Sequence, residues 1–296
     1  WHANKGLRGR GDLQTMKRFL VLVNPSSHGG RSGRRWRQLA GLLPEGEFVL
    51  LTSIEEAEER ARAAQGYETV VACGGDGTVR AVAAGVLENA DENLKFGVLY
   101  TGTSPDFCTA QDIPIEPEAA IRLLRSGAFR EMPVLTANGH PFFCSLNLGI
   151  GAAVAEAANR LRPRLGDRLG TFVALVGALL RARSYSVELG DLQVEACVHF
   201  LITRIPFIAG GLRLALPELK ENEYAAWFVR RPSLWGWLGL LCRLYSGKPC
   251  GEFHIIRDAA RLRSDESLPV EFDGDPQGCL PVEVRFASRR LKLVCP

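Results

Sequence analysis

Residues 70–82 read VVACGGDGTVRAV, an apolar run that ends in three glycines and an aspartate before a helical pattern begins. From Val79 to Leu87, apolar residues recur at the spacing of one helix face. A tight turn from a buried strand into a helix directs backbone N–H groups, and the positive end of the helix dipole, toward one point. Glycines there allow a bulky anion to approach the backbone. The stretch predicts a turn that binds phosphate; the alternative is a turn whose glycines serve its geometry alone.

The aspartate of this turn and two further loops extend the prediction. Asp76 would repel a bare phosphate, so it indicates a divalent metal ion between the two. Polar loops that contain glycine also follow two other strand-like runs, at residues 24–30 and 101–107. Open α/β sheets bind ligands at the carboxyl ends of their strands. Three such loops together predict a site for a nucleotide polyphosphate.

Two patterns divide the chain. Before residue 130, helical stretches alternate with four short apolar runs, at 18–24, 48–52, 68–73 and 95–101. This alternation is typical of a parallel sheet with helices on both faces. Strand-like runs then follow one another, with a hairpin signal at Asn138-Gly139. We therefore expect a doubly wound α/β domain at 17–130 and an antiparallel β domain at 131–296. Residues 1–16, which end at the first methionine, are expected to be an upstream segment outside the fold.

Composition argues against several classes of protein. The eight cysteines among the 296 residues are scattered without a C-x-x-C pair. This argues against a disulfide scaffold or a zinc site and favours reduced thiols in a cytoplasmic protein. The net charge of +3 is too small to indicate nucleic acid as a partner. No segment reaches the roughly 18 consecutive apolar residues that a membrane-spanning helix needs.

The ordered motifs resemble one known family. N-P-x-S-x-G at residues 24–29, G-G-D-G-T at 74–78 and G-T-x-x-D-F at 102–107 are similar to the diacylglycerol kinase catalytic domain family, which includes bacterial lipid kinases and sphingosine kinases. The likeness continues through the second half, in FFCSLNLGIGAAVAEA from residue 142, IPFIAGGLRLALPEL from residue 205 and EFDGD from residue 271. The resemblance therefore covers almost the whole chain after residue 16.

The resemblance implies a lipid kinase that uses ATP and Mg²⁺. Its substrate would be the hydroxyl of a neutral lipid such as diacylglycerol. The family fold joins an α/β nucleotide-binding domain to an antiparallel β-sandwich, with the active site in the cleft between them. Asp76 would lie beside the magnesium-bound phosphates. The ATP site would be formed by Asn24, Pro25, Ser26, Thr52, Gly74, Gly75, Asp76, Gly77, Thr78 and Thr103.

The resemblance assigns catalysis to Asp275, Asp273 and Asp76. Asp273 and Asp275 are two residues apart, so a strand would place both on one face. A carboxylate there can accept the proton of a lipid hydroxyl as the hydroxyl attacks the terminal phosphoryl group. Spacing alone favours the alternative, a solvated hairpin, because acid-Gly-acid is common in turns.

Several positions depart from the family pattern. Arg80-Ala81 stand in place of an asparagine and a glutamate, and Ser104-Pro105 in place of a pair that ends in an amide. Ala152-Ala153 lack an acid that sphingosine kinases use. Glu221-Asn222-Glu223 replace a magnesium-binding stretch of bacterial relatives, and Asp275 is shorter than the usual glutamate. These changes concern the metal network and the acceptor site and leave the phosphate loops intact.

Two alternative functions therefore stay open beside the lipid kinase. One is a non-catalytic nucleotide- or lipid-binding protein of the same fold, which these departures favour. The other is a different G-G-D-G kinase, one that acts on NAD or a sugar phosphate. The ordered set of loops and the late E-F-D-G-D motif argue against this second alternative.

A lipid kinase must meet its substrate at a membrane surface, and two stretches are candidates for that contact. Residues 233–248 combine Trp235, Trp237 and Tyr245 with leucines and end in basic residues, as an interfacial helix does. Residues 159–170 are rich in arginine and suited to anionic headgroups. The alternatives are a core helix and an ordinary solvated loop. The expected location is cytoplasmic, with peripheral contact at the inner face of the membrane.

Overall fold

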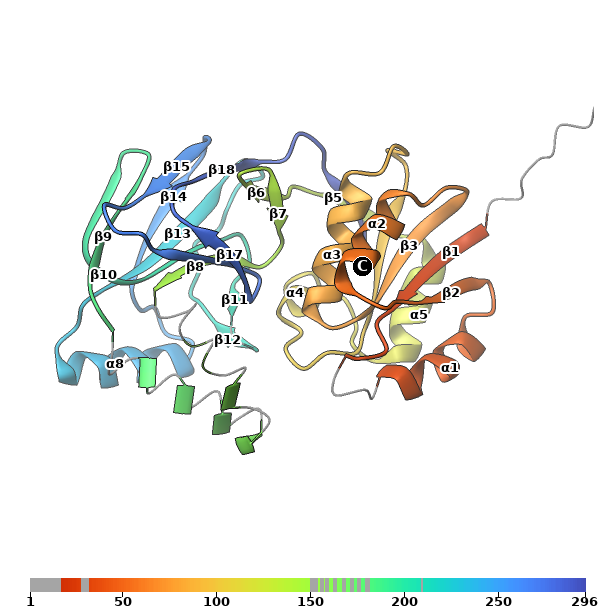
Figure 1. Ribbon diagram of the computed structural model, residues 1–296, viewed down its shortest axis with the longest axis horizontal. Coiled ribbons are helices and arrows are strands. Elements are labelled where there is room, and N and C mark those ends of the chain that lie inside the picture. The colour runs from red at the N-terminus through yellow and green to blue at the C-terminus, as the bar shows by residue number, and fades with distance from the viewer. Residues whose placement is uncertain are drawn as a thin grey trace, which may run out of the picture.

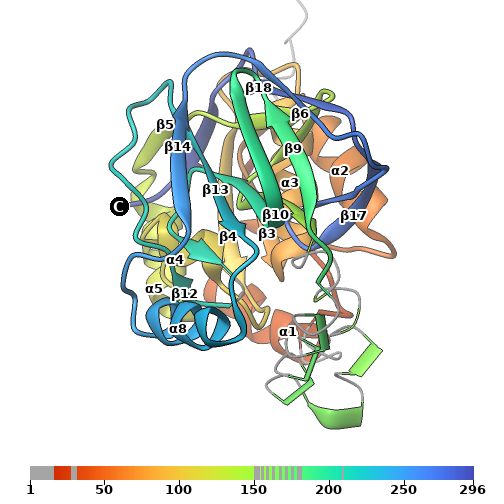
Figure 2. The same ribbon diagram turned by 90° about the vertical axis from the view of Figure 1, so that its left-hand side faces the viewer.

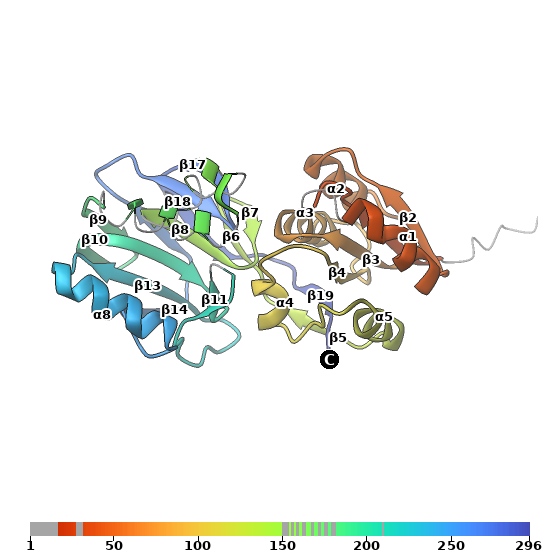
Figure 3. The same cartoon turned by 90° about the horizontal axis from the view of Figure 1, so that it is seen from below.

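The computed structural model describes residues 17–27, 32–149, 182–208 and 210–296, together with scattered residues between 154 and 178. Of Lys17, residues 32–35 and Leu234, it describes the backbone alone. The described residues form two lobes that lie side by side, as Figures 1 and 3 show. The first lobe is built on a six-stranded sheet and the second on an eleven-stranded one.

The first lobe is a mostly parallel sheet in the order β2-β1-β3-β4-β19-β5, with β5 antiparallel to β19. Its strands are β1 (Lys17–Val23), β2 (Gly46–Leu50), β3 (Tyr67–Gly74), β4 (Lys95–Tyr100), β5 (Phe129–Met132) and β19 (Leu291–Val294). Its helices are α1 (Ser32–Leu42), α2 (Ile54–Arg62), α3 (Asp76–Leu87), α4 (Asp106–Ala110) and α5 (Pro117–Ser126).

Helices cover both faces of this sheet because its strands are apolar on both. Leu20 and Leu22 of β1 pack into a core with α2 and α3, whereas Phe19 and Val21 pack into a second core with α1 and α5. The side chains of successive strand residues point to opposite faces, so one apolar strand supplies both cores. This is the doubly wound α/β arrangement that the sequence predicts.

The order of the strands locates a ligand site. From β1 the chain passes to β2 on one side of the sheet and then to β3 on the other. The loops after β1 and β3 therefore leave the sheet in opposite directions from neighbouring strands. Open α/β sheets bind ligands outside the carboxyl ends of their strands at such a switch point. The first two predicted phosphate loops flank it.

The second lobe is an antiparallel β-sandwich, as predicted, and Figure 2 shows it from its free side. Its sheet contains β6 (Leu135–Ala137), β7 (His140–Phe142), β8 (Ser145–Gly149), β9 (Tyr185–Leu189), β10 (Leu192–Thr203), β13 (Tyr224–Arg230), β14 (Glu252–Ile256), β15 (Ala260–Arg263), β16 (Pro269–Phe272), β17 (Asp275–Cys279) and β18 (Val282–Phe286). A small separate hairpin joins β11 (Phe207–Ile208) to β12 (Leu212–Arg213), and helix α8 spans Leu234–Tyr245.

Strand β10 belongs to both layers of the sandwich. Its first half pairs with β9, and its second half pairs with β8 and β13. The register shifts between Val194 and His199, where Ala196 has a φ of 52°. A bulge of this kind bends a strand and lets it pass from one layer to the next. Side chains from both layers, such as Phe200 and Leu262, meet in one core.

One strand departs from the predicted division of the chain at residue 130. The division places residues 131–296 in the second domain, but β19 lies in the first sheet, parallel to β4 and antiparallel to β5. Figure 3 shows it returning to the first lobe. The local pattern of residues 291–294 specifies a strand but not its partners, which lie far away in the sequence. The lobes are thus linked by the segment after β5 and by the segment before β19.

Other local predictions can be compared with the structure directly. The hairpin at Asn138-Gly139 is confirmed, with φ values of 51° and 87° that suit this pair of residues. The stretch 233–248 forms the helix α8, and Ser233 Oγ accepts the Gly236 N–H at 3.1 Å. Five of the twelve residues of the arginine-rich stretch 159–170 lie outside the described residues, so the prediction for this stretch is not tested. Among those described, no helix is both long and apolar enough to cross a membrane.

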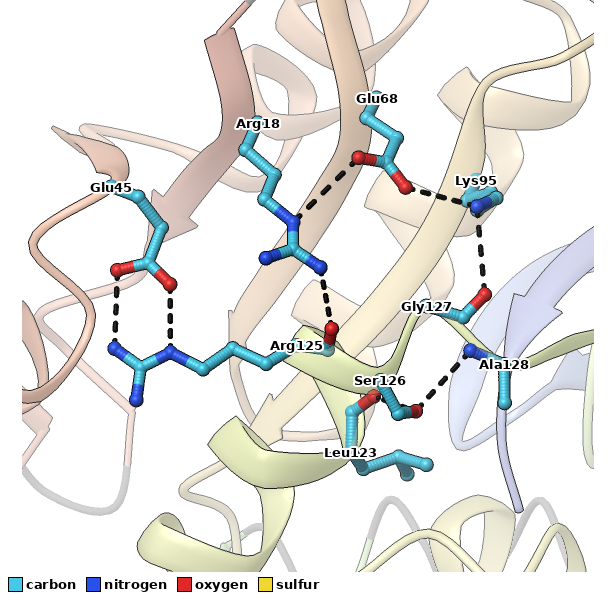
Figure 4. A network of polar contacts seen from close by, with 9 residues as sticks. All are labelled: Arg18, Glu45, Glu68, Lys95, Leu123, Arg125, Ser126, Gly127 and Ala128. Atoms are coloured by element: carbon cyan, nitrogen blue, oxygen red, sulfur yellow. Dashed lines mark hydrogen bonds and ion pairs between the residues drawn. The ribbon is translucent and has the colours of Figure 1, made fainter.

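The amino ends of the parallel strands are joined by a charged network, drawn in Figure 4. Glu68 at the start of β3 accepts Lys95 Nζ of β4 at 3.0 Å and lies 3.6 Å from Arg18 Nε of β1. Arg125 near the end of α5 forms two contacts with Glu45, at 2.7 and 3.1 Å. The charged side chains drawn in Figure 4 are thus paired with one another at this edge of the sheet.

We predict that Gly85→Ala destabilises the protein although alanine is the better helix former. A Cβ on Gly85 of α3 would lie 2.3 Å from the Glu58 carbonyl of α2 and 2.7 Å from Ala61 Cβ. Overpacking of this kind costs about 1–3 kcal/mol of unfolding free energy. The control is Gly41→Ala in α1, where a Cβ would meet nothing within 4 Å. We expect Gly41→Ala to stabilise by roughly 0.5 kcal/mol. Urea titration of both variants tests the pair, and equal effects would contradict it.

Candidate functional site

The loops that follow β1 and β3 are joined by hydrogen bonds at the carboxyl edge of the first sheet. The side-chain amide of Asn24 donates to Thr78 Oγ1 at 3.0 Å, and the Gly75 N–H donates to Ser27 Oγ at 3.3 Å. The Ser26 N–H donates to Asn24 Oδ1 at 3.0 Å and fixes the turn of the first loop. The structure therefore brings together two of the three loops that the sequence singles out, linked through Asn24 and Ser27.

The third loop joins them through close contact between glycine backbones. The Thr101 N–H donates to the Gly74 carbonyl at 2.8 Å. A Cβ on Gly102 would lie 2.7 Å from Gly75 Cα, and one on Gly74 would lie 2.4 Å from Thr78 Oγ1. Close packing of the loops therefore requires Gly74 and Gly102, which agrees with the alternative that the glycines serve the geometry of the turn. Gly77 differs, since no atom lies within 4 Å of where its Cβ would be.

Helix α3 begins in this open space without a side-chain cap. Its N-cap residue is Gly75, which has no side chain to accept the first N–H groups of the helix. Uncapped N–H groups at a helix start, together with the helix dipole, favour a bound anion. The amino end of α3 is therefore suited to phosphate, and Gly77 leaves room for it.

Asp76 is the first residue of α3 and is held by a tyrosine. The Tyr100 hydroxyl donates to Asp76 Oδ2 at 2.8 Å and accepts the Ser104 N–H at 3.0 Å. Asp76 Oδ1 is buried and has no hydrogen-bond partner among the described residues. Burial is the main cause that raises the pKa of Asp76 from 3.8 to about 6, and the charge of Asp106 adds to it. A buried carboxylate oxygen without a partner suits a cation or a donor that arrives with a ligand.

Asp106, at the end of the third loop, connects the two lobes. Its Oδ2 accepts the N–H of Gly210, in the β11–β12 turn, at 2.8 Å. Its Oδ1 is buried and unpaired within the described part of the chain, and burial raises its pKa. A Cβ on Gly210 would lie 3.0 Å from Ser104 Oγ, so the two loops are in contact. Asp106 belongs to the G-T-x-x-D-F motif that the sequence singles out, but it is not among the residues that the sequence predicts for the site.

The motif at residues 271–275 forms a turn rather than a continuous strand. Asp273 and Gly274 have φ values of 51° and 93° and join β16 to β17. The prediction that Asp273 and Asp275 share one face of a strand is therefore wrong, because the chain reverses between them. The alternative, a solvated hairpin, is correct in predicting a turn, but the Asp273 side chain is buried and not solvated.

Asp273 is occupied by backbone N–H groups. Its Oδ2 accepts Phe143 N–H at 2.8 Å, and its Oδ1 accepts those of Cys144 and Ser145 at 2.8 and 2.9 Å. Burial raises the pKa of Asp273, and these three donors oppose the rise. Asp273 therefore fixes the hairpin to the β7–β8 connection and has little capacity for a further donor.

Asp275 extends from the hairpin toward the first lobe. Its Oδ2 accepts Arg80 Nη2 of α3 at 2.8 Å, and its side chain is 48% exposed. Arg80 is 18% exposed, and its Nε is buried without a partner among the described residues. The last acid of the late motif thus lies beside the helix that starts the phosphate site, which the sequence did not reveal.

Comparisons with known proteins agree with this architecture. The family model of the diacylglycerol kinase catalytic domain matches residues 18–137. A protein of Pseudomonas aeruginosa named "Probable lipid kinase YegS-like" is 31% identical over 223 residues, which cover 72% of each chain. The chain belongs to the diacylglycerol kinase catalytic domain family. The diacylglycerol kinase of Bacillus subtilis is 26% identical over 302 aligned residues, 95% of this chain and 97% of that one. A crystal structure of a diacylglycerol kinase from Bacillus anthracis shares the fold, with a TM-score of 0.76 at 17% identity over 95% of this chain and 97% of that one.

The remaining predicted nucleotide residues lie in the loops that follow β1, β2 and β4. Thr52 follows β2 and is exposed, and both its N–H and its hydroxyl donate to Glu56 Oε2 at 2.6 Å. Thr103 is exposed in the third loop. Pro25 belongs to the turn after β1. The structure thus gives Thr52 a role in starting α2, where Ser53 Oγ accepts the Glu56 N–H at 3.1 Å.

Among the described residues, the acids that depart from the family pattern at 221–223 form ion pairs with arginines. Glu223 is buried and accepts Arg257 Nε at 2.9 Å, and Glu221 accepts Arg290 Nη2 at 2.8 Å. This acidic stretch is therefore committed to arginines. Ala152-Ala153 lie outside the described residues. Within the described ranges, no three histidine, cysteine, aspartate or glutamate residues are placed to hold a metal ion together.

A cavity of about 270 Å³ lies away from these loops, where the lobes are linked. Its walls come from both lobes and include Arg130, Phe143 and Arg204. None of the predicted site residues lines it. The candidate site for phosphate is therefore the group of three loops and not this cavity.

We predict that Asp76→Asn makes the protein more stable at pH 8. The pKa of Asp76 is raised in the folded state, so the bound proton favours folding. That stability is complete below the ordinary pKa of 3.8 and is lost as the pH rises through about 6. At pH 8 the charged carboxylate then costs about 3 kcal/mol of unfolding free energy, which the amide avoids.

Urea titrations at pH 4.5 and pH 8 measure this effect. The gain from Asp76→Asn should be largest at pH 8 and shrink to well under half at pH 4.5. Asp265→Asn removes an exposed carboxylate from the second lobe and serves as the control. A gain for Asp76→Asn that is the same at both pH values would contradict the prediction.

Proposed function

We propose that this protein is an ATP- and Mg²⁺-dependent lipid kinase that phosphorylates the hydroxyl of a neutral lipid such as diacylglycerol. One observation carries the proposal: three loops meet at the uncapped end of α3, beside the unpaired Oδ1 of Asp76. Asp275 from the second lobe lies next to the same helix. A phosphate site and a partly exposed carboxylate on opposite lobes are what phosphoryl transfer to a second substrate requires.

The phosphate donor would bind at the switch point of the first sheet. The open space at Gly77 and the uncapped N–H groups of α3 suit a polyphosphate. Asn24 and Thr78 hold the first two loops in register around it. Membership in a kinase family supports ATP as the donor.

Asp76 fits a magnesium ion that binds together with the nucleotide. Mg²⁺ is commonly held by one or two carboxylates, substrate phosphates and water, so a cluster of three protein ligands is not required. The buried, unpaired Oδ1 of Asp76 suits such a ligand, and the Tyr100 hydroxyl fixes the other oxygen. When bound, the ion would neutralise charge on the phosphates.

Asp275 is the better candidate for the base. Its carboxylate is 48% exposed and is held by Arg80, whereas Asp273 already accepts three N–H groups. Asp275 would accept the proton of the lipid hydroxyl, whose oxygen forms the new bond to phosphorus while the bond from phosphorus to the ADP oxygen breaks. Asp273 would keep the hairpin in place.

The outer face of α8 supports contact with a membrane surface. Trp235, Leu238 and Tyr245 are 83%, 56% and 61% exposed, while Leu240 and Leu244 of the same helix pack against the lobe. From residue 224 to residue 251 the chain carries four arginine or lysine residues and no carboxylate. Exposed aromatic and leucine side chains with cations beside them suit an anionic interface. The core-helix alternative accounts for only one face of α8.

The second candidate function is nucleotide binding without transfer. It is favoured by the ion pair between Arg80 and Asp275, which occupies the proposed base. In that case the phosphate loops would bind ATP and no lipid would be phosphorylated.

We predict transfer of labelled phosphate from ATP to one lipid among diacylglycerol, monoacylglycerol, ceramide and sphingosine in mixed micelles with Mg²⁺. Asp76→Asn and Asp275→Asn should each lower the rate by about 100-fold or more. Asp265→Asn, an exposed carboxylate elsewhere, should not change it. ATP binding without labelled lipid would support the non-catalytic alternative, and labelled NAD would support the other kinase class.

We also predict that Trp235→Ser/Leu238→Ser weakens binding to phosphatidylglycerol-containing vesicles by about tenfold or more, since each buried side chain contributes about 1.5–3 kcal/mol. Flotation with the vesicles measures the bound fraction, and ATP binding should be unchanged. Ile115→Ser removes an equally exposed side chain from the first lobe and is the control. Equal binding by both variants would show that α8 does not meet the membrane.

A further inference from the structure

Arg80 belongs to α3, the helix whose amino end forms the candidate phosphate site. It follows Asp76 by four residues in the same helix, so the two side chains lie on one face, one turn apart. Side chains of a helix lean toward its amino end, which here is the end where the three loops meet. Helix geometry therefore directs the Arg80 side chain along α3 toward the end that suits a polyphosphate.

The hydrogen-bonding capacity of Arg80 is only partly used. Its Nη2 donates to Asp275 Oδ2 at 2.8 Å. Its Nε is buried and, in the part of the chain that the structure describes, finds no acceptor. A guanidinium has five N–H donors, and buried donors are almost always paired. A buried donor without an acceptor among the described residues suits an acceptor that arrives with a ligand.

The charges around Arg80 also call for such an acceptor. Its positive charge acts on Asp273 as well as on Asp275, and Asp273 in turn acts on Asp76. Arg80 is thus the cation in a group of carboxylates, at the point where a triphosphate would add negative charge. An arginine binds phosphate through paired N–H donors that match its oxygens.

We propose that Arg80 binds the terminal phosphate of a nucleoside triphosphate and exchanges Asp275 for it when the nucleotide arrives. This rests on the proposed function in taking the nucleotide as the phosphate donor and Asp275 as the proton acceptor. Asp275 and the terminal phosphate compete for one guanidinium. Binding of the triphosphate therefore frees the Asp275 carboxylate at the moment when a proton acceptor is needed.

The test compares the affinity of ADP with that of the non-hydrolysable βγ-imido analogue of ATP, measured by calorimetry with Mg²⁺ and without lipid. Arg80→Gln should weaken binding of the analogue by about 10–100-fold and change that of ADP by less than about threefold. Arg80→Lys should weaken binding of the analogue less than Arg80→Gln does, because lysine keeps the positive charge. Arg263→Gln, which breaks an exposed ion pair of the second lobe, is the matched control.

The variant Asp275→Asn tests whether Asp275 competes with the terminal phosphate for Arg80 or only forms a structural ion pair with it. If Asp275 competes with the phosphate, its loss should tighten binding of the analogue several-fold, and the gain should vanish in Arg80→Gln/Asp275→Asn. A ratio of the two affinities that is the same in wild type, Arg80→Gln and Arg80→Lys would overturn the proposal, with thermal unfolding used to confirm that the variants fold. So would a wild type that binds neither nucleotide.

These measurements are distinct from the test of the lipid kinase itself. A ratio that depends on Arg80, without labelled lipid, would support the phosphate contact and contradict the proposed reaction. Labelled lipid, together with a ratio of affinities that does not change in the Arg80 variants, would support the proposed reaction and contradict the phosphate contact.

Discussion

The site depends on the contact between two glycine backbones, Gly75 after β3 and Gly102 after β4. A Cβ on Gly102 would lie 2.7 Å from Gly75 Cα, so no other residue fits there without displacing a loop. This contact draws the third loop over the start of α3 and lets the Tyr100 hydroxyl reach Asp76. The helix end itself remains uncapped because its N-cap residue is Gly75, where a Cβ would lie only 3.3 Å from Gly102 Cα. One steric constraint thus produces both the open phosphate site and the buried carboxylate beside it.

The two edges of the first sheet show how stability and function are divided. At the amino edge, Glu68 is shared between Lys95 and Arg18, and the charges there are matched (Figure 4). At the carboxyl edge, Asp76 Oδ1 and Asp106 Oδ1 are buried without partners among the residues described. Each unpaired buried group costs roughly 1–3 kcal/mol, so a fold selected for stability alone would not keep them. Conflicts of this kind are expected at functional sites.

Local patterns in the sequence were sufficient for the first four strands, the three loops and the Asn138-Gly139 hairpin, because each is determined by residues close together in the chain. They were insufficient for β19, whose partners β4 and β5 lie in the other half of the sequence. The spacing of Asp273 and Asp275 was interpreted as a strand, but the positive φ of Asp273 makes it a turn. A left-handed aspartate before glycine is a local signal, so this error was avoidable. The contact of Arg80 with Asp275 could not be predicted from local sequence, because the two residues are 195 positions apart.

Arg80 and Asp275 were judged separately in the sequence as two departures from the family, and in the structure they form one ion pair. Stability does not explain the pair. With Asp275 48% exposed, such a contact contributes about 0–1 kcal/mol. The buried, unpaired Nε of the same arginine costs roughly 1–3 kcal/mol. The arrangement is therefore unfavourable for the protein alone and becomes favourable once an acceptor reaches Nε. Judged by these magnitudes, the two substitutions are better explained as parts of a phosphate-binding device than as the loss of one.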